Sequence, residues 1–241
     1  MPINHIEVCF TPGLFDFRLI RNDFVVVVVD VLRAGTSICA AFKKGIEKII
    51  PVGDLEEVKK YKDSGYLVAG ERDGLQLDFA DFGNSPNEFA DVDLESKTMA
   101  YSTTNGTQAI EIARKADSLA IGTFSNLTSI AGWLSEQDKN IVILCAGWKN
   151  AFSLEDTVFA GALIEKLTSN QYYGIAGDSV FASLKLWEIA KIDLDSFLRM
   201  GSHFERLKKI GAEDDFKFAL KIDSTQVVPV LKDNYLINIR K

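Results

Sequence analysis

The chain has 241 residues, of which 47% are hydrophobic and 25% are charged, the proportions of a globular protein with a sizeable core. Its 34 acidic residues outnumber its 27 basic residues, and the net charge of −7 argues against nucleic acid as a partner, because nucleic-acid binders carry a clustered basic face. We expect one domain over residues 1–241, or two intimately packed lobes within that length.

The cellular location is predicted from segments that the sequence lacks. No apolar run approaches the roughly 18 residues that span a bilayer, and the stretch 1–5 has neither the basic start nor the apolar core of a signal peptide. Cys9, Cys39 and Cys145 are odd in number and widely spaced, which favours reduced thiols over a disulfide framework. We therefore expect a cytoplasmic protein without a membrane partner, and a homodimer is the working hypothesis for its assembly.

Short strands alternate with helices along most of the chain. Strands are predicted at 6–10, 24–29, 46–52, 66–69, 98–101, 140–145, 227–230 and 235–239, and helices at 36–44, 55–61, 108–115, 153–167, 179–190, 195–200 and 203–210. This alternation predicts an α/β fold, layered α/β/α, with a parallel or mixed sheet.

Five consecutive valines, Val25–Val29, predict the central strand of that sheet. A β-branched run with no polar face is typical of a strand that is covered on both sides. In open α/β sheets, ligands bind at the carboxyl ends of the strands, where helix N-termini offer unpaired N–H groups to anions. We therefore expect the chemistry at Asp30–Ser37.

Two parts of the sequence can be aligned as copies of one β-turn-α-β-α unit. Gly35-Thr36 falls on Gly106-Thr107, and Ile50 falls on Ile121. Although few positions are identical, the alignment predicts an internal duplication of this unit.

The turn after the valine strand carries an acid, a base and two hydroxyls. Asp30 ends a buried strand, where a carboxylate needs a cation or several donors, so it is a candidate Mg²⁺ ligand or nucleophile. A structural ion pair between Asp30 and Arg33 is the alternative. Arg33 has the planar fork that suits phosphate or carboxylate, and Thr36 and Ser37 either bind an anion or cap the helix.

Four further segments supply polar groups. Glu71 and Arg72 follow a strand and belong either to the site or to a hairpin with a surface ion pair. Asn84 and Ser85 open a short helix in which Glu88 completes a capping box, and the same start can also cradle an anion. The uncharged turn 103–107, with Thr104 and Asn105, is suited to binding oxyanions. Asp156, next to Glu155 near a later strand, is either a further candidate metal ligand or the capping-box residue of the helix that Ser153 caps.

Several phosphate-hydrolysing classes are excluded by missing motifs. The chain has only two histidines, no cysteine followed six positions later by arginine, no second aspartate two residues after Asp30, and no phosphate loop ending in Gly-Lys-Ser or Gly-Lys-Thr. The remaining oxygen ligands, arginines and hydroxyl-lined turns favour a Mg²⁺ site that acts on a small anion.

Taken together, the motifs resemble the 2-phosphosulfolactate phosphatase family. The matching segments span nearly the whole chain, with Gly35 as a departure where Ser or Thr is expected. They are Asp30-Val31-Leu32-Arg33-Ala34, Gly70-Glu71-Arg72, Gly83-Asn84-Ser85-Pro86, Thr103-Thr104-Asn105-Gly106-Thr107, Cys145-Ala146-Gly147, Glu155-Asp156, Ser202-His203, Asp214-Asp215 and Val228-Pro229.

The resemblance implies a Mg²⁺-dependent hydrolase that converts 2-phospho-3-sulfolactate, a small anionic phosphorylated substrate, to 3-sulfolactate and phosphate, a step toward coenzyme M. It implies metal ligation by Asp30, with Glu71 and Asp156 as further ligands. Catalysis would involve Asp30 and Arg33, and the groups implied to bind substrate are Arg33, Thr36, Ser37, Arg72, Asn84, Ser85, Thr104 and Asn105, with Lys149 as an additional cation.

Three alternatives stay open at the level of sequence. The attacking group is either a metal-activated water or Asp30 itself, which would form a phosphoaspartate. The substrate is either the sulfonated ester or another small phosphate monoester. A non-catalytic sensor or carrier of phosphorylated or sulfonated acids would use the same anion-binding turns.

Overall fold

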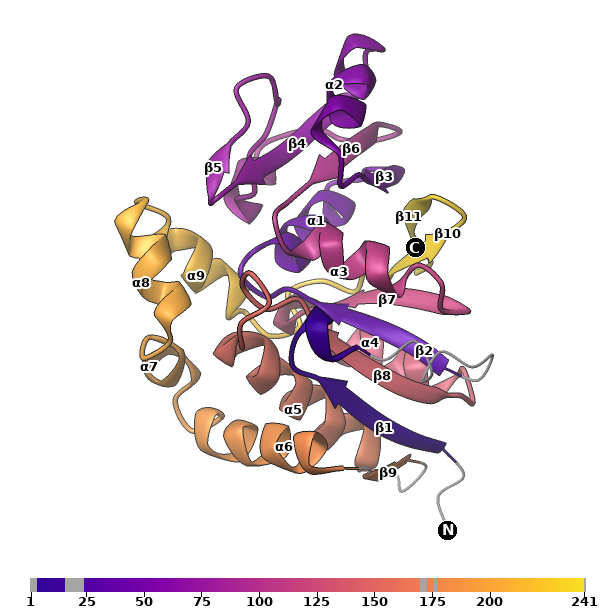
Figure 1. Ribbon diagram of the computed structural model, residues 1–241, viewed down its shortest axis with the longest axis vertical. Coiled ribbons are helices and arrows are strands. Elements are labelled where there is room, and N and C mark those ends of the chain that lie inside the picture. Colours follow the sequence, from indigo (N-terminus) through magenta and orange to yellow (C-terminus); the bar gives the residue numbers. More distant parts are fainter. Residues whose placement is uncertain (1–3, 16–23, 170–172, 176, 241) are drawn as a thin grey trace.

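A computed structural model describes residues 4–15, 24–169, 173–175 and 177–240 (Figure 1). Met1 to Ile3, part of the stretch judged for a signal peptide, lie outside the described residues. The described strands form one sheet in the order β5-β4-β6-β3-β11-β10-β7-β2-β8-β1-β9. Their bounds are β1 Asn4–Cys9, β2 Phe24–Val29, β3 Lys48–Pro51, β4 Leu67–Arg72, β5 Leu75–Gln76, β6 Thr98–Ser102, β7 Ser118–Gly122, β8 Asn140–Cys145, β9 Tyr173–Ile175, β10 Pro229–Lys232 and β11 Tyr235–Asn238.

Two groups of parallel strands are joined by an antiparallel hairpin. One group is β4-β6-β3 and the other is β7-β2-β8-β1-β9. The hairpin β10–β11 lies between them, with β10 antiparallel to β7 and β11 antiparallel to β3. The sheet is therefore mixed and mostly parallel, as predicted.

The helices cover both faces of the sheet around β2. They are α1 Ala34–Lys43, α2 Leu55–Asp63, α3 Gly106–Ala113, α4 Leu127–Ser135, α5 Leu154–Thr168, α6 Asp178–Ala190, α7 Leu194–Leu198, α8 Ser202–Lys209 and α9 Glu213–Ala219, with 3-10 turns η1 Pro12–Leu14, η3 Pro86–Phe89 and η4 Phe124–Asn126.

Every residue of β2 is buried, and the alternation of its side chains supplies two cores. Val25, Val27 and Val29 pack in the cluster that contains residues of α4, α5 and α6. Val26 and Val28 pack in the cluster that contains residues of α1 and α3. Because successive strand residues face opposite sides, an unbroken valine run needs this double cover. The predicted buried central strand and α/β/α layers are confirmed.

The two units aligned in the sequence exchange their second strands. The strand β2 pairs with β7 rather than with β3, and β6 pairs with β3 rather than with β7. Each β-turn-α-β unit therefore crosses to the other part of the sheet in the same way. This reciprocal arrangement is consistent with the predicted duplication.

Several local predictions were wrong or incomplete. The short strand β9 and the short helix α9 were not expected, because a few residues carry too little periodicity. The strand β4 continues through Arg72 and turns into β5, so the hairpin alternative is correct for the backbone at Glu71–Arg72. Ser85 caps its helix as predicted, but Glu88 accepts a bond from the Gly83 N–H instead of closing a capping box on Ser85.

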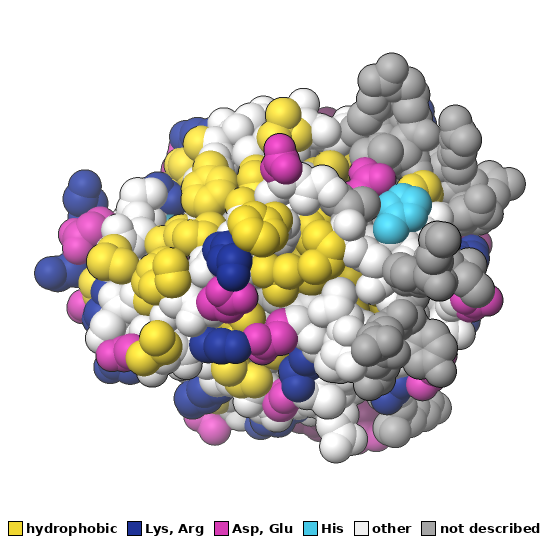
Figure 2. Space-filling model, turned by 90° about the horizontal axis from the view of Figure 1, so that it is seen from below, with side chains coloured by type: hydrophobic (Ala, Val, Ile, Leu, Met, Phe, Trp, Pro, Cys, Tyr) yellow, Lys and Arg dark blue, Asp and Glu magenta, His cyan; other side chains and the backbone are white. Residues whose placement is uncertain are grey.

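An apolar area lies on the face that Figure 2 shows, the underside of the view in Figure 1. On α6, Phe181 and Ile189 are each 58% exposed, and Ile192 follows the helix at 85%. None of the helices in the described part of the chain combines the length and the apolar character needed to cross a bilayer.

Candidate active site

A cavity of about 200 Å³ opens beyond the carboxyl ends of the strands. Asp30 follows β2, Glu71 lies in β4, and Asn105 follows β6. Asn84, Arg33 and Trp148 contribute from loops. The helix α8 supplies the facing wall with His203, Arg206, Leu207 and Lys209. The cavity therefore lies where ligands bind in open α/β sheets, at the carboxyl ends of the strands.

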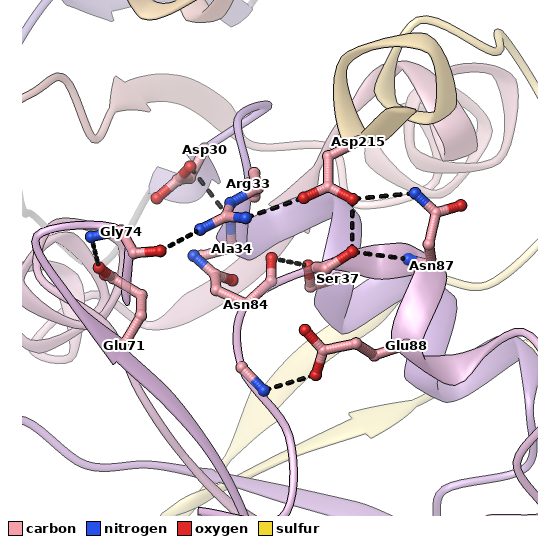
Figure 3. Close-up of polar contacts among 12 residues, drawn as sticks. Asp30, Arg33, Ala34, Ser37, Glu71, Gly74, Asn84, Asn87, Glu88 and Asp215 are labelled. Atoms are coloured by element: carbon pink, nitrogen blue, oxygen red, sulfur yellow. Dashed lines mark hydrogen bonds and ion pairs between the residues drawn. The ribbon is translucent and has the colours of Figure 1, made fainter. Parts of the chain in front are cut away.

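Asp30 is buried and has one carboxylate oxygen without a hydrogen bond among the described residues. Its Oδ1 accepts a bond of 3.2 Å from the Ala34 N–H at the start of α1 (Figure 3). A Cβ added to Gly106 would lie 2.9 Å from Oδ2, so glycine makes room for this oxygen. Burial raises the pKa of Asp30 to about 6, opposed by the charge of His203 and by the Ala34 bond. A cation at Oδ2 would offset this cost of burying the charge.

Arg33 forms a buried ion pair, but its partner is Asp215 of α9. Arg33 Nη1 donates to Asp215 Oδ2 over 2.8 Å, and Nη2 donates to the Gly74 carbonyl over 3.0 Å (Figure 3). Asp215 Oδ1 also accepts from the Ser85 hydroxyl and from Asn87 Nδ2. The alternative of an Asp30–Arg33 pair is therefore replaced by a longer-range one. Arg33 still lines the cavity, with its charge balanced by Asp215.

The predicted hydroxyl groups face the protein itself. The Thr36 hydroxyl donates to the Val31 carbonyl and the Ser37 hydroxyl to the Asn84 carbonyl, each over 2.8 Å. Both side chains are fully buried, and the Ser85 hydroxyl is bound to Asp215 outside the residues that line the cavity. These contacts hold the turn after β2 in place, and a direct role in substrate binding stays a prediction.

Glu71 joins two turns at the cavity wall. Its Oε1 accepts from the Thr104 N–H over 2.7 Å, and its Oε2 accepts from the Gly74 N–H over 2.6 Å. Thr104 thus contributes its backbone to this wall, and its side chain is not among the residues that line the cavity.

The two predicted asparagines line the cavity with defined orientations. Burial raises the pKa of Tyr101 well above its ordinary value, so its hydroxyl is protonated and donates to Asn84 Oδ1. This contact leaves the Asn84 amide NH₂ as its free donor group. Asn105 Oδ1 accepts from the Lys149 N–H over 2.9 Å, which leaves its NH₂ free in the same way.

Two predicted cations are engaged elsewhere. Arg72 donates to the carbonyls of Glu71 and Gly53 and to the Ser102 hydroxyl, and it does not line the cavity. The Lys149 ammonium lies 2.6 Å from Asp73 in an exposed ion pair. Neither side chain directs its charge into the cavity.

Asp156 lies behind the cavity and connects two loops. Its Oδ1 accepts from the Val31 N–H over 2.9 Å, and its Oδ2 accepts from the Gly147 N–H over 3.2 Å. Burial, with the neighbouring charges of Glu155 and Asp30, raises the pKa of Asp156 well above its ordinary value. Its role as a metal ligand stays a prediction.

The described residues contain no group of three or more His, Cys, Asp or Glu side chains placed to hold a metal ion. Mg²⁺ is commonly held by one or two carboxylates, with waters and substrate phosphate oxygens as its other ligands. Asp30 and Glu71 line one cavity and match that modest requirement.

A histidine–glutamate pair completes the cavity. His203 Nδ1 donates to Glu155 Oε1 over 2.6 Å, and the imidazole ring lies 5.5 Å from the Trp148 ring. Burial acts to raise the pKa of Glu155, but the interaction with His203 outweighs it and the pKa is lowered. Glu155 is therefore ionised and fixes the orientation of the imidazole.

The family model described as 2-phosphosulpholactate phosphatase matches residues 9–234. The chain belongs to this family. A protein of Caldanaerobacter subterraneus subsp. tengcongensis named "Probable 2-phosphosulfolactate phosphatase" is 35% identical over 212 residues, covering 86% of this chain and 88% of its own. Proteins of the same name from Thermotoga maritima and Prochlorococcus marinus are also 35% identical, over 211 residues (88% and 90% of the two chains) and 215 residues (86% and 88%).

Family membership confirms the resemblance and the enzyme class, a hydrolase of phosphoric monoesters. Within the cavity of this 2-phosphosulpholactate phosphatase family member, the structure brings together Asp30, Arg33, Glu71, Asn84 and Asn105. Sequence reasoning assigned no role to His203, Arg206 or Trp148. The segment Ser202-His203 had contributed to the resemblance, but no local pattern indicates which distant loop it faces.

Proposed function

We propose that the chain is a Mg²⁺-dependent phosphatase that hydrolyses 2-phospho-3-sulfolactate to 3-sulfolactate and phosphate. The observation that carries this proposal is a buried Asp30 with an unpaired oxygen in a cavity that also contains Glu71 and several cationic side chains. Family membership supports the reaction class, and the names of the relatives support the substrate.

Asp30 and Glu71 would hold the metal, with Asp156 as the remaining candidate ligand. When bound, Mg²⁺ supplies positive charge to the phosphoryl oxygens and lowers the pKa of a bound water. The amide groups of Asn84 and Asn105 and the N–H groups of Arg33 that are not bound to Asp215 or Gly74 would donate to the same oxygens. Thr36 and Ser37 keep these donors in place.

His203 would act at the opposite end of the breaking bond. The departing oxygen of sulfolactate needs a proton, and imidazole is the commonest donor of one. Its Nδ1 is bound to Glu155, so Nε2 is the atom that would hold this proton.

We place the enzyme in the cytoplasm, where its buried cysteine thiols would stay reduced. A homodimer remains part of the proposal, with the exposed apolar face of Figure 2 available for a contact.

Phosphate release from synthetic 2-phosphosulfolactate tests the proposal. We expect release by the wild type with Mg²⁺, none with a chelator, and a loss of at least about a hundredfold in kcat for Asp30→Asn, which keeps the size of the side chain and removes its charge. The matched control is Asp214→Asn, because the Asp214 side chain is 84% exposed and pairs with Lys217 on the surface.

Other outcomes identify the alternatives. Faster release from another ester in a panel of phosphate monoesters would reassign the substrate. Binding of ligand without Mg²⁺-dependent release, retained in Asp30→Asn, would make the chain a sensor or carrier. Acid quenching during turnover of ³²P-labelled substrate separates the two chemical routes, because label bound covalently to Asp30 would show a phosphoaspartate, whereas direct water attack leaves no label on the chain.

A further inference from the structure

The helix α8 presents a row of three nitrogen-bearing side chains to the cavity. His203, Arg206 and Lys209 are spaced three residues apart, so they lie along one face of the helix. At a rise of about 1.5 Å per residue, Arg206 lies about 4.5 Å and Lys209 about 9 Å farther along the helix axis than His203. The row therefore extends beyond the position where His203 would meet the departing oxygen.

Arg206 is held in place on one side and lacks a partner on the other. Its guanidinium lies 4.6 Å from the centre of the Trp148 ring, and its Nη1 donates to the Ser202 hydroxyl over 3.1 Å. Its Nε is buried without a hydrogen-bond partner among the described residues. Leaving a buried donor unpaired is unfavourable, and such an orphaned group calls for a functional explanation.

The other cations near the cavity form direct ion pairs, but within the described residues those of α8 do not. Arg33 is paired with Asp215, and Lys149 with Asp73. Within the part of the chain that the structure describes, neither Arg206 nor Lys209 has an acidic side chain within ion-pair distance. The cavity thus has carboxylates at the strand ends and two cations on α8 that form no direct ion pair among the described residues, although the Glu155 carboxylate interacts with Arg206 at longer range.

We propose that Arg206, assisted by Lys209, binds the sulfonate group of the substrate and determines the preference for a sulfonated ester. This inference rests on the proposed function. With Nη1 occupied by Ser202 and Nε shielded from solvent, Nη2 is the guanidinium nitrogen left to donate a charge-assisted hydrogen bond to a sulfonate oxygen. Lys209, one turn farther, adds charge without fixed geometry.

The test compares three substrates. They are 2-phosphosulfolactate, 2-phospholactate, which lacks the sulfonate, and the phosphate ester of 2-hydroxypropane-1-sulfonate, which lacks the carboxylate. For Arg206→Met we expect kcat/KM to fall about 10- to 100-fold on both sulfonated esters, mainly through KM, and less than about threefold on 2-phospholactate. Arg206→Lys should recover part of the loss, since charge remains and the fork does not.

Matched variants on α8 separate charge from helix stability. Lys209→Met should lower kcat/KM on the sulfonated substrates by a smaller factor than Arg206→Met does. Lys208 lies on the exposed face of the same helix and outside the cavity lining, so Lys208→Met should leave kcat/KM unchanged on all three substrates. Thermal unfolding of each variant checks that the fold is retained.

Two kinetic results would overturn the proposal. An equal fall in kcat/KM of Arg206→Met on all three substrates would show that Arg206 only supports the structure. If kcat/KM instead falls on the two carboxylates and not on the carboxylate-free ester, Arg206 binds the carboxylate. If the wild type releases no phosphate from any of them, the proposed function fails. The sulfonate contact can then still be tested by calorimetry, because Arg206→Met should weaken the binding of 3-sulfolactate and leave the binding of lactate unchanged.

Discussion

The ion pair between Arg33 and Asp215 connects the turn after β2, the β4–β5 turn and α9. Arg33 bonds to Asp215 and to the Gly74 carbonyl, and Asp215 accepts two further bonds from Ser85 and Asn87. Both charges are almost fully buried, with side-chain exposures of 9% and 5%. A buried pair of this kind contributes mainly through the cost of separating its members.

Removal of one member of this pair should therefore be costly. We expect Asp215→Ala to lower the free energy of unfolding by about 3–5 kcal/mol, because the Arg33 charge stays buried without a partner. Urea unfolding measures this value. The neighbouring variant Asp214→Ala should cost less than about 1 kcal/mol, since it removes only an exposed pair, and equal losses would contradict the assignment.

At the scale of elements, α5 and α6 approach each other closely at Gly161. A Cβ built on Gly161 would lie 2.1 Å from the Ser183 carbonyl oxygen and 2.7 Å from Trp187 Cβ. We expect Gly161→Ala to destabilise the protein by about 1–3 kcal/mol, because the two helices must move apart.

The same substitution elsewhere gives the control for Gly161. Gly132 lies in α4, and its nearest neighbours beyond the helix are the ends of the flexible Arg240 side chain, at 3.5 Å and farther. Gly132→Ala should stabilise by about 0.5–1 kcal/mol through helix propensity. Similar melting temperatures for the two variants would show that the α5–α6 contact is less tight than described.

A polar contact between α5 and α6 gives a prediction for acid pH. Hydrogen bonds from Lys191 and Trp187 lower the pKa of Glu165 below its ordinary 4.5. The folded state thus favours the carboxylate, so its stabilisation is complete above pH 4.5 and is lost as the pH falls through the lowered pKa.

We expect Glu165→Gln to be less stable than wild type by less than about 1 kcal/mol at pH 7, because the pair is nearly half exposed. The difference should shrink below pH 4.5 in urea unfolding measured across pH. Glu188→Gln, which removes an exposed pair within α6, is the control. A difference that does not depend on pH would assign the effect to packing instead of charge.

At the scale of the whole molecule, the hairpin β10–β11 joins two parallel groups of strands into one sheet (Figure 1). Leu236 of β11 is fully buried and pairs with Ile49 of β3. The prediction of a single domain depends on the pairing of this hairpin with both strand groups, because the two groups could otherwise unfold independently.

Leu236→Ala tests that prediction. We expect a loss of about 2–5 kcal/mol, with tryptophan fluorescence and far-UV circular dichroism reporting one shared midpoint. Trp133 and Trp187 pack in the core cluster that contains residues of β1, β2, β7 and β8, so separate midpoints would instead indicate two lobes. Lys232→Ala, an exposed change in the same hairpin, should stay within about 0.5 kcal/mol of wild type.

Much of the fold and part of the site could be predicted from local sequence. The valine run predicted a buried strand, and β2 is observed at Phe24–Val29. Asp54 and Ser153 cap α2 and α5, because capping depends on residues three positions apart. The position of Asp30 at the end of β2 follows from the same local signals, as does its burial.

The tertiary structure decided which partner each charged side chain contacts. Arg33 is balanced by Asp215, 182 positions away, and Asp156 is bound to the turn after β2, whereas Arg206 and His203 reach the cavity from a late helix. Periodicity and capping report on neighbours within a few residues, but charge pairing depends on which loops the sheet order brings together. The sequence by itself therefore determined the strand end that carries Asp30, and only the folded chain determined which cations remain free to meet an anion there.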